Sequence, residues 1–157
     1  ISGGLPVSKR PPQRQKLRLQ ELTRWSKFLN INLNTQPNFF PSKSLLPSLI
    51  IIAAKMEKLD NYFELAFKIM NSLWVENQDI DDEDVLKKIL NRMNFDAENI
   101  ILLAKSEKCL DIMNKYTQLA ITKNVFGAPT YIIEDQIYWG QDRLDFVERH
   151  LNSMNMD

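Results

Sequence analysis

The sequence has 157 residues, of which 44% are hydrophobic and 25% charged, and its 20 basic residues balance its 20 acidic ones. This length suits one compact domain, and the balanced charge gives no reason to expect a nucleic-acid partner. The longest apolar run, residues 49–54, is far shorter than the ~20 residues that cross a bilayer, and no charged region precedes an apolar signal stretch, so we expect no membrane partner.

The opening residues, 1–10, contain glycines and a proline and indicate a loop. Two prolines suited to a first helical turn follow, and apolar residues at helical spacing predict a helix over residues 13–30 with a basic outer face. Residues 31–41 indicate a short extended piece and then an irregular loop, which Phe39 and Phe40 are expected to anchor. A helix that is apolar on nearly every side is predicted over residues 42–59.

Further helices are predicted from a capping residue followed by an apolar pattern. Asp60 precedes the helix that runs to Trp74, and the acidic stretch 79–84 precedes a helix through Leu90. Asp96 and Ser106 stand before two more helices, the last of which ends near residue 123. The middle of the sequence therefore forms a large helical block.

The end of the sequence predicts a β-hairpin and a closing helix. Residues 131–133 and 137–139 are β-branched or aromatic, and they flank the turn residues Glu134 and Asp135. Gly140 ends the hairpin, and an apolar helical pattern follows it. This order of elements indicates an α+β or α/β fold and names no function.

Cys109 is the single cysteine of the sequence, and His150 is the single histidine. One cysteine excludes an internal disulfide and a C-x-x-C pair, and with them a dithiol oxidoreductase mechanism. We therefore expect a reducing compartment, the cytoplasm. We expect no metal site, because the sequence has no cluster of His and Cys.

The segment that carries most chemical information is FGAPT at residues 126–130, followed by WGQDRL at residues 139–144. Proline has no N–H to donate, so a strand ladder can begin only after Pro129. Only ~5% of X-Pro bonds in folded proteins are cis, so the residues by themselves favour a trans bond before the strand.

These two segments, at this spacing, resemble the carboxy-terminal signature of 2-hydroxychromene-2-carboxylate isomerases and kappa-class glutathione transferases, relatives of the DsbA proteins. The resemblance extends through GGLP at residues 3–6, KRP at 9–11, QRQ at 13–15, ELTRW at 21–25 and FFP at 39–41. It implies an α/β, thioredoxin-like fold with a large inserted α-helical domain. Residues 1–41 and 106–157 would form the thioredoxin-like part, and residues 42–105 the insert.

The resemblance also implies a glutathione site. Pro129 matches the family's cis proline, and Ala128 matches the residue whose main-chain N–H and C=O pair with the cysteinyl part of glutathione like an added strand. Gln141 and Asp142 match the pair that holds the γ-glutamyl end. The alternative role of Asp142 is a plain N-cap of the closing helix, and the two roles are compatible.

Lys9 and Arg10 lie where the family places groups near the carboxylates of glutathione or the substrate; alternatively they belong to a solvated basic face. In the family, the chain opens with a β-strand that ends at a serine, whose hydroxyl favours the thiolate of glutathione. No segment here matches that opening. The resemblance therefore implies a chain truncated at its amino terminus, without the first βαβ unit and without a catalytic residue of its own.

The function that the resemblance implies is glutathione-dependent cis-trans isomerisation, through addition of the thiolate to a conjugated alkene. Glutathione would be the cofactor, and a small aromatic or conjugated electrophile the substrate. The alternatives are a kappa-class-like transferase or peroxidase, and a non-catalytic thioredoxin-like binding module. Open strand edges in a shortened sheet invite pairing with a second chain, so a homodimer is a further expectation.

Overall fold

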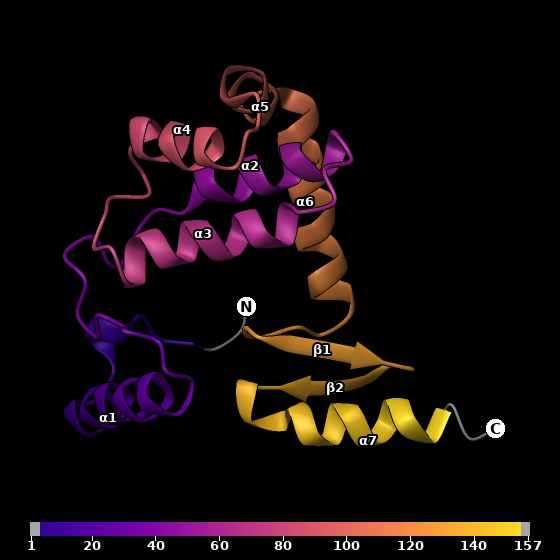
Figure 1. Cartoon of the computed structure of the whole chain (residues 1–157). Coiled ribbons are helices and arrows are strands. Elements are labelled where there is room, and N and C mark those ends of the chain that lie inside the picture. Colours follow the sequence, from indigo (N-terminus) through magenta and orange to yellow (C-terminus); the bar gives the residue numbers. More distant parts are fainter. Residues whose placement is uncertain (1–3, 155–157) are drawn as a thin grey trace. The chain divides into compact units, whose positions relative to one another are not determined.

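A computed structural model describes residues 4–154 of the chain (Figure 1). Gly3, which belongs to the first of the resembling segments, lies outside the described residues. By its internal contacts the chain divides into two compact units, Val7–Asn114 and a smaller one made of Ile1–Pro6 and Lys115–Asp157. The domain boundaries expected from the family resemblance stay a prediction.

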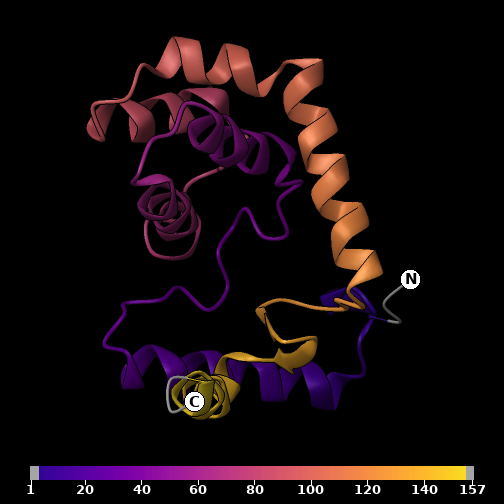
Figure 2. The ribbon, with the colours of Figure 1, turned by 90° about the vertical axis from the view of Figure 1, so that its right-hand side faces the viewer.

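The larger unit is built from helices (Figure 1). A 3₁₀ turn, η1 (Val7–Lys9), lies where the sequence indicated loop alone, because the N–H of Arg10 bonds back to the carbonyl of Val7 at 3.2 Å. The helices that follow are α1 (Pro12–Phe28), α2 (Leu45–Met56), α3 (Tyr62–Trp74), α4 (Glu83–Arg92), α5 (Ala97–Ala104) and the first part of α6 (Glu107–Thr122). The helix α6 is continuous, and its residues belong to both units (Figure 2). No described helix is long and apolar enough to cross a membrane.

The core of the larger unit lies between α2, α3, α4 and α5. As expected of a helix that is apolar on nearly every side, α2 buries Leu49, Ile50, Ile52, Ala53 and Ala54, and Ile51 is half-buried. The partners of these residues are fully or almost fully buried side chains of the next three helices: Leu65, Ile69 and Leu73 of α3, Leu86, Ile89 and Leu90 of α4, and Ile100 and Ile101 of α5. The stability of this unit therefore rests on the packing of the four helices α2, α3, α4 and α5 against one another.

Three predicted helix starts are confirmed by side-chain hydrogen bonds. The carboxylates of Asp82 and Asp96 accept from the N–H groups of Asp84 and Asn99, at 2.9 and 3.1 Å, and the hydroxyl of Ser106 accepts from the Cys109 N–H at 3.2 Å. Each bond satisfies an N–H group that has no partner inside its helix.

The predicted cap at Asp60 is wrong. The helix α3 begins at Tyr62, with Asn61 before it, and Asn61 makes no side-chain cap hydrogen bond. A turn precedes the helix, in which the Tyr62 N–H donates to the Leu59 carbonyl at 3.2 Å. The chain therefore enters α3 later than the sequence suggested.

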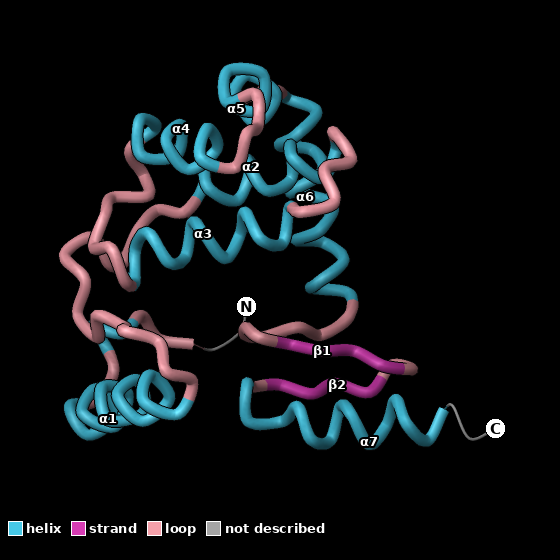
Figure 3. The backbone as a smooth tube through the Cα atoms, in the orientation of Figure 1, coloured by secondary structure: helices cyan, strands magenta, loops and turns pink. Residues whose placement is uncertain are grey.

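Residues 31–44 form a loop without the short extended piece that the sequence indicated (Figure 3). Phe40 anchors this loop, because its ring lies 4.9 Å from that of Trp74, centroid to centroid, whereas Phe39 is largely exposed. The guanidinium of Arg18 lies over both rings, at 5.2 Å from Phe40 and 5.8 Å from Trp74. The expected anchoring by two phenylalanines is therefore confirmed for Phe40 alone.

The smaller unit holds the predicted hairpin, β1 (Thr130–Ile133) and β2 (Gln136–Trp139), which pair antiparallel with Ile132 opposite Ile137. The turn residues Glu134 and Asp135 have φ values of 47° and 65°, the positive values that a two-residue hairpin turn of type I′ requires. A 3₁₀ turn, η2 (Gln141–Arg143), then leads into α7 (Leu144–Met154). The helix α7 packs against the hairpin.

Cys109 is completely buried near the start of α6, and its thiol donates to the carbonyl of Leu49 at 3.3 Å. Burial raises the pKa of this thiol, because the thiolate is poorly solvated there. The unfolded chain therefore releases the proton at a lower pH than the folded chain. The contribution of the protonated Cys109 thiol to the free energy of unfolding is fully present below the unfolded-state pKa, ~8.5, and is lost as the pH rises through the folded-state pKa.

We expect Cys109 to react with an aromatic disulfide reagent at least about a hundredfold more slowly in the native protein than in denaturant. Even a local opening that costs ~3 kcal/mol leaves about one molecule in a hundred open to the reagent. The measurement is the release of the coloured thiol with time at pH 8, with Cys109→Ala as the blank. Equal rates in both conditions would contradict a buried thiol.

Candidate functional site

The loop before β1 carries Ala128 and Pro129, both exposed on the smaller unit. The Ala128–Pro129 peptide bond is cis, as the family resemblance implied and contrary to the trans bond that frequencies favour. Among the described residues, no hydrogen-bond partner exists for the N–H or the C=O of Ala128. The main chain at Ala128 is therefore open to a ligand that hydrogen-bonds like a strand.

A hydrogen bond joins this loop to the end of the hairpin. The N–H of Gly140 donates to the carbonyl of Pro129 at 3.0 Å, next to the pairing of Thr130 with Trp139. The hydroxyl of Thr130 also donates to the Gly127 carbonyl at 2.5 Å. The two segments of the sequence motif thus lie side by side, and Gln141 follows directly after the bonded Gly140.

Two glycines are needed for this geometry. A Cβ at Gly127 would lie 2.5 Å from Nε1 of Trp139, whose ring also packs on Phe126 with centroids 5.2 Å apart. Gly140 has a φ of 114°, which residues with a side chain rarely adopt. The first glycine admits the indole ring, and the second turns the chain from the strand into η2.

Gln141 and Asp142 are exposed on η2, ahead of α7. The alternative role of Asp142 as an N-cap is wrong. Helical structure begins before it, at Gln141, directly after Gly140 with its positive φ, and no side-chain hydrogen bond caps this start. The carboxylate of Asp142 instead lies 3.2 Å from Nη1 of Arg143, in an ion pair whose two side chains are half exposed. It stays accessible to a cationic group of a ligand.

Lys9 and Arg10 belong to the larger unit, whereas the other four expected site residues belong to the smaller one. Lys9 is exposed at the end of η1, and the carbonyl of Arg10 accepts from the side-chain amide of Gln15 at 2.7 Å. Burial, and to a lesser extent the charge of Arg10, lowers the pKa of Arg18. The role of Lys9 and Arg10 at a shared site stays a prediction.

Sequence reasoning missed a polar chain between the hairpin and α7. Nδ1 of His150 lies 2.8 Å from the Tyr138 hydroxyl, and Nε2 lies 3.4 Å from a carboxylate oxygen of Glu134. The His150 side chain is only 13% exposed. An imidazole between a phenol and a carboxylate can pass a proton between them, but no spacing in the sequence indicates this contact.

Comparison with known proteins agrees with the resemblance read from the sequence. A family model described as a DSBA-like thioredoxin domain matches residues 1–152. A 2-hydroxychromene-2-carboxylate isomerase of Sphingobium xenophagum is 26% identical over 136 residues, which are 87% of this chain and 67% of that protein. One of Pseudomonas sp. (strain C18) is 23% identical over 128 residues, 82% of this chain and 58% of that protein.

A solved structure of a 2-hydroxychromene-2-carboxylate isomerase matches with a TM-score of 0.75 at 21% identity, and the match covers 97% of this chain and 72% of that one. The chain thus spans about 67% and 58% of the lengths of the two curated relatives described above. The structural match confirms the expected fold class, here mostly helical with a small two-stranded sheet. Because the family model spans nearly all of it, this chain belongs to the family of DSBA-like thioredoxin domains.

Proposed function

We propose that this chain binds glutathione and belongs to an enzyme that isomerises a substrate like 2-hydroxychromene-2-carboxylate. The observation that carries the proposal is the unpartnered main chain of Ala128, followed by Pro129, whose carbonyl accepts a hydrogen bond from Gly140, two residues before the exposed Asp142. The names of the curated relatives support isomerisation as the reaction class.

Each of these residues has a distinct task in the proposed site. The N–H and C=O of Ala128 pair with the cysteinyl residue of glutathione as an added strand does. The carboxylate of Asp142 pairs with the γ-glutamyl ammonium, and the Gln141 amide with the N–H groups at this helical start suits the neighbouring carboxylate.

When bound, glutathione would supply a thiolate nucleophile for reversible addition to the conjugated alkene of the substrate, the chemistry by which a former double bond can rotate. The residues of this site hold the tripeptide at its γ-glutamyl end and at its cysteinyl residue, and so fix where its sulfur lies. A fixed sulfur turns an encounter between two molecules into a reaction inside one complex, which lowers the entropic part of the barrier.

A kappa-class-like transferase or peroxidase would use the same hold on glutathione, and in a transferase the sulfur stays on the electrophile. Product analysis separates the two reactions. An isomer of unchanged mass supports the proposal, and a product heavier by one glutathione would support a transferase instead.

We expect glutathione to raise the melting temperature of the protein, because a ligand that binds only the folded state stabilises it by about 2.7 kcal/mol at a hundred times its Kd. Asp142→Ala should remove most of this shift, since the γ-glutamyl ammonium loses its counter-charge. The control is Asp145→Ala, an exposed carboxylate in the first turn of α7. No shift at millimolar glutathione, or a full shift in Asp142→Ala, would contradict the proposed site.

A further inference from the structure

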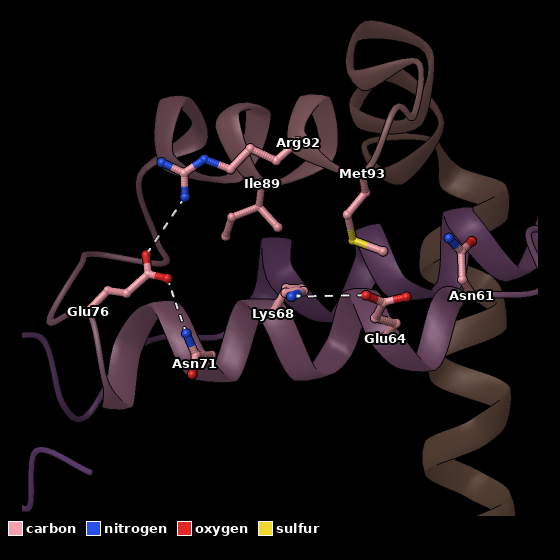
Figure 4. Close-up of a pocket in the computed structure, with 8 residues that line it drawn as sticks. All are labelled: Asn61, Glu64, Lys68, Asn71, Glu76, Ile89, Arg92 and Met93. Atoms are coloured by element: carbon pink, nitrogen blue, oxygen red, sulfur yellow. Dashed lines mark hydrogen bonds and ion pairs between the residues drawn. The ribbon is translucent and has the colours of Figure 1, made fainter. Parts of the chain in front are cut away.

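A groove of the helical unit lies between α3 and α4 (Figure 4). Its volume is about 390 Å³, within the range of ~300–1,000 Å³ that small-molecule sites occupy. The residues that line it all belong to the larger unit and are separate from those proposed to hold glutathione.

Two cations and two carboxylates line the groove as two loose pairs. Nζ of Lys68 lies 4.0 Å from a carboxylate oxygen of Glu64, and Nη1 of Arg92 lies 4.0 Å from one of Glu76. Both distances exceed hydrogen-bond length, so each charged group retains the capacity to bond a ligand. The Glu76 carboxylate is also positioned by the side-chain amide of Asn71, which donates to it at 3.1 Å.

An apolar wall stands opposite the charges of α3. Ile89 points from α4 toward α3, and Met93, which directly follows α4, points toward α3 near the Lys68–Glu64 pair (Figure 4). Ile89 is 6% exposed and belongs to the core of the helical unit. Met93 is partly buried and packs against that core. The groove thus combines opposite charges with a patch suited to a short aliphatic group.

We propose that this groove binds a free α-amino acid with an aliphatic side chain. The carboxylate of the ligand lies with Lys68, its ammonium with the neighbouring Glu64, and its side chain against Ile89 and Met93. A ligand with a single charge gains less binding free energy than one with both charges. Each cation of the lining has a carboxylate beside it, so a single charge that is attracted to one member of a pair is repelled by the other. The ligand replaces exposed ion pairs, which contribute little by themselves, with bonds to two complementary groups at once.

The test is calorimetric titration of the whole chain with L-leucine, isocaproate and isoamylamine. The last two share the aliphatic group of leucine and carry only the negative or only the positive charge. We expect leucine to bind, and each analogue to bind at least about tenfold more weakly, the effect of one lost charge-assisted hydrogen bond. No heat with leucine, or equal affinity for an analogue, would overturn the proposal.

Variants assign the binding to this groove. Lys68→Gln should weaken leucine binding about tenfold or more, and Lys68→Arg should keep it, because only the charge is required. Lys88→Gln is the matched control, since Lys88 is exposed on α4 and does not line the groove. Asp142→Ala should leave leucine binding unchanged, which separates this site from the one proposed for glutathione. Equal binding by Lys68→Gln and the natural protein would refute the assignment.

Discussion

Replacing Leu65 by alanine is expected to lower the free energy of unfolding by about 2–5 kcal/mol. Leu65 is completely buried on α3 and belongs to the cluster around α2. The substitution removes apolar contacts and leaves a cavity that closely packed helices fill only in part. Chemical denaturation followed by circular dichroism measures the change, provided that the transition stays cooperative.

Phe67 offers a matched control two residues further along the same helix, because its side chain is 53% exposed. Phe67→Ala is expected to change the free energy of unfolding by no more than about 0.5 kcal/mol. The two substitutions therefore report which face of α3 carries the core. A cost at Phe67 as large as that at Leu65 would contradict the described orientation of α3.

Regular elements with local signals were predictable from the sequence. The hairpin follows from β-branched and aromatic residues on both sides of Glu134 and Asp135, because side-chain shape and turn geometry both act within a few residues. The starts at Asp82 and Asp96 likewise depend on a carboxylate and an N–H two or three residues away. These caps and turns need only residues within one helical turn or one hairpin loop, so the local sequence indicates them.

The start of α2 depends on a distant residue and was therefore placed too early. The carboxylate of Asp81 accepts from the N–H groups of Lys43 and Ser44, at 2.7 and 3.0 Å. Ser44 has a φ of 57°, so the helix begins only at Leu45. Nothing in residues 42–45 alone reveals that the carboxylate of Asp81, which follows both α2 and α3 in the sequence, accepts hydrogen bonds from them.

The two candidate sites also differ in whether the local sequence indicates them. Ala128, Pro129, Gln141 and Asp142 are found through a motif in which the two segments flank one hairpin, so their proximity follows from its register. The groove between α3 and α4 was missed, because Lys68 and Arg92 come from different helices and each resembles an ordinary solvated charge. Only the packing of the helices places an apolar wall between them.

Gly140→Ala is expected to destabilise the protein by about 1–3 kcal/mol and to abolish the glutathione-dependent rise in melting temperature. Gly140 has φ 114° and ψ 150°, a region that is essentially restricted to glycine. A chain that avoids this conformation shifts the bond from Gly140 to Pro129, and with it the position of Asp142 relative to Ala128. Thermal unfolding with and without millimolar glutathione measures both effects.

A Cβ at residue 140 would also meet the carboxylate of Asp142, so the cost has two candidate sources, the backbone and this contact. The double variant Gly140→Ala with Asp142→Ala separates them. It removes the contact with the Asp142 carboxylate, but an alanine at residue 140 still has to adopt the positive φ. We expect the double variant to stay as unstable as Gly140→Ala, since the positive φ at residue 140 carries the cost. Recovery of stability in the double variant would assign the requirement for glycine to the side chain of Asp142 instead.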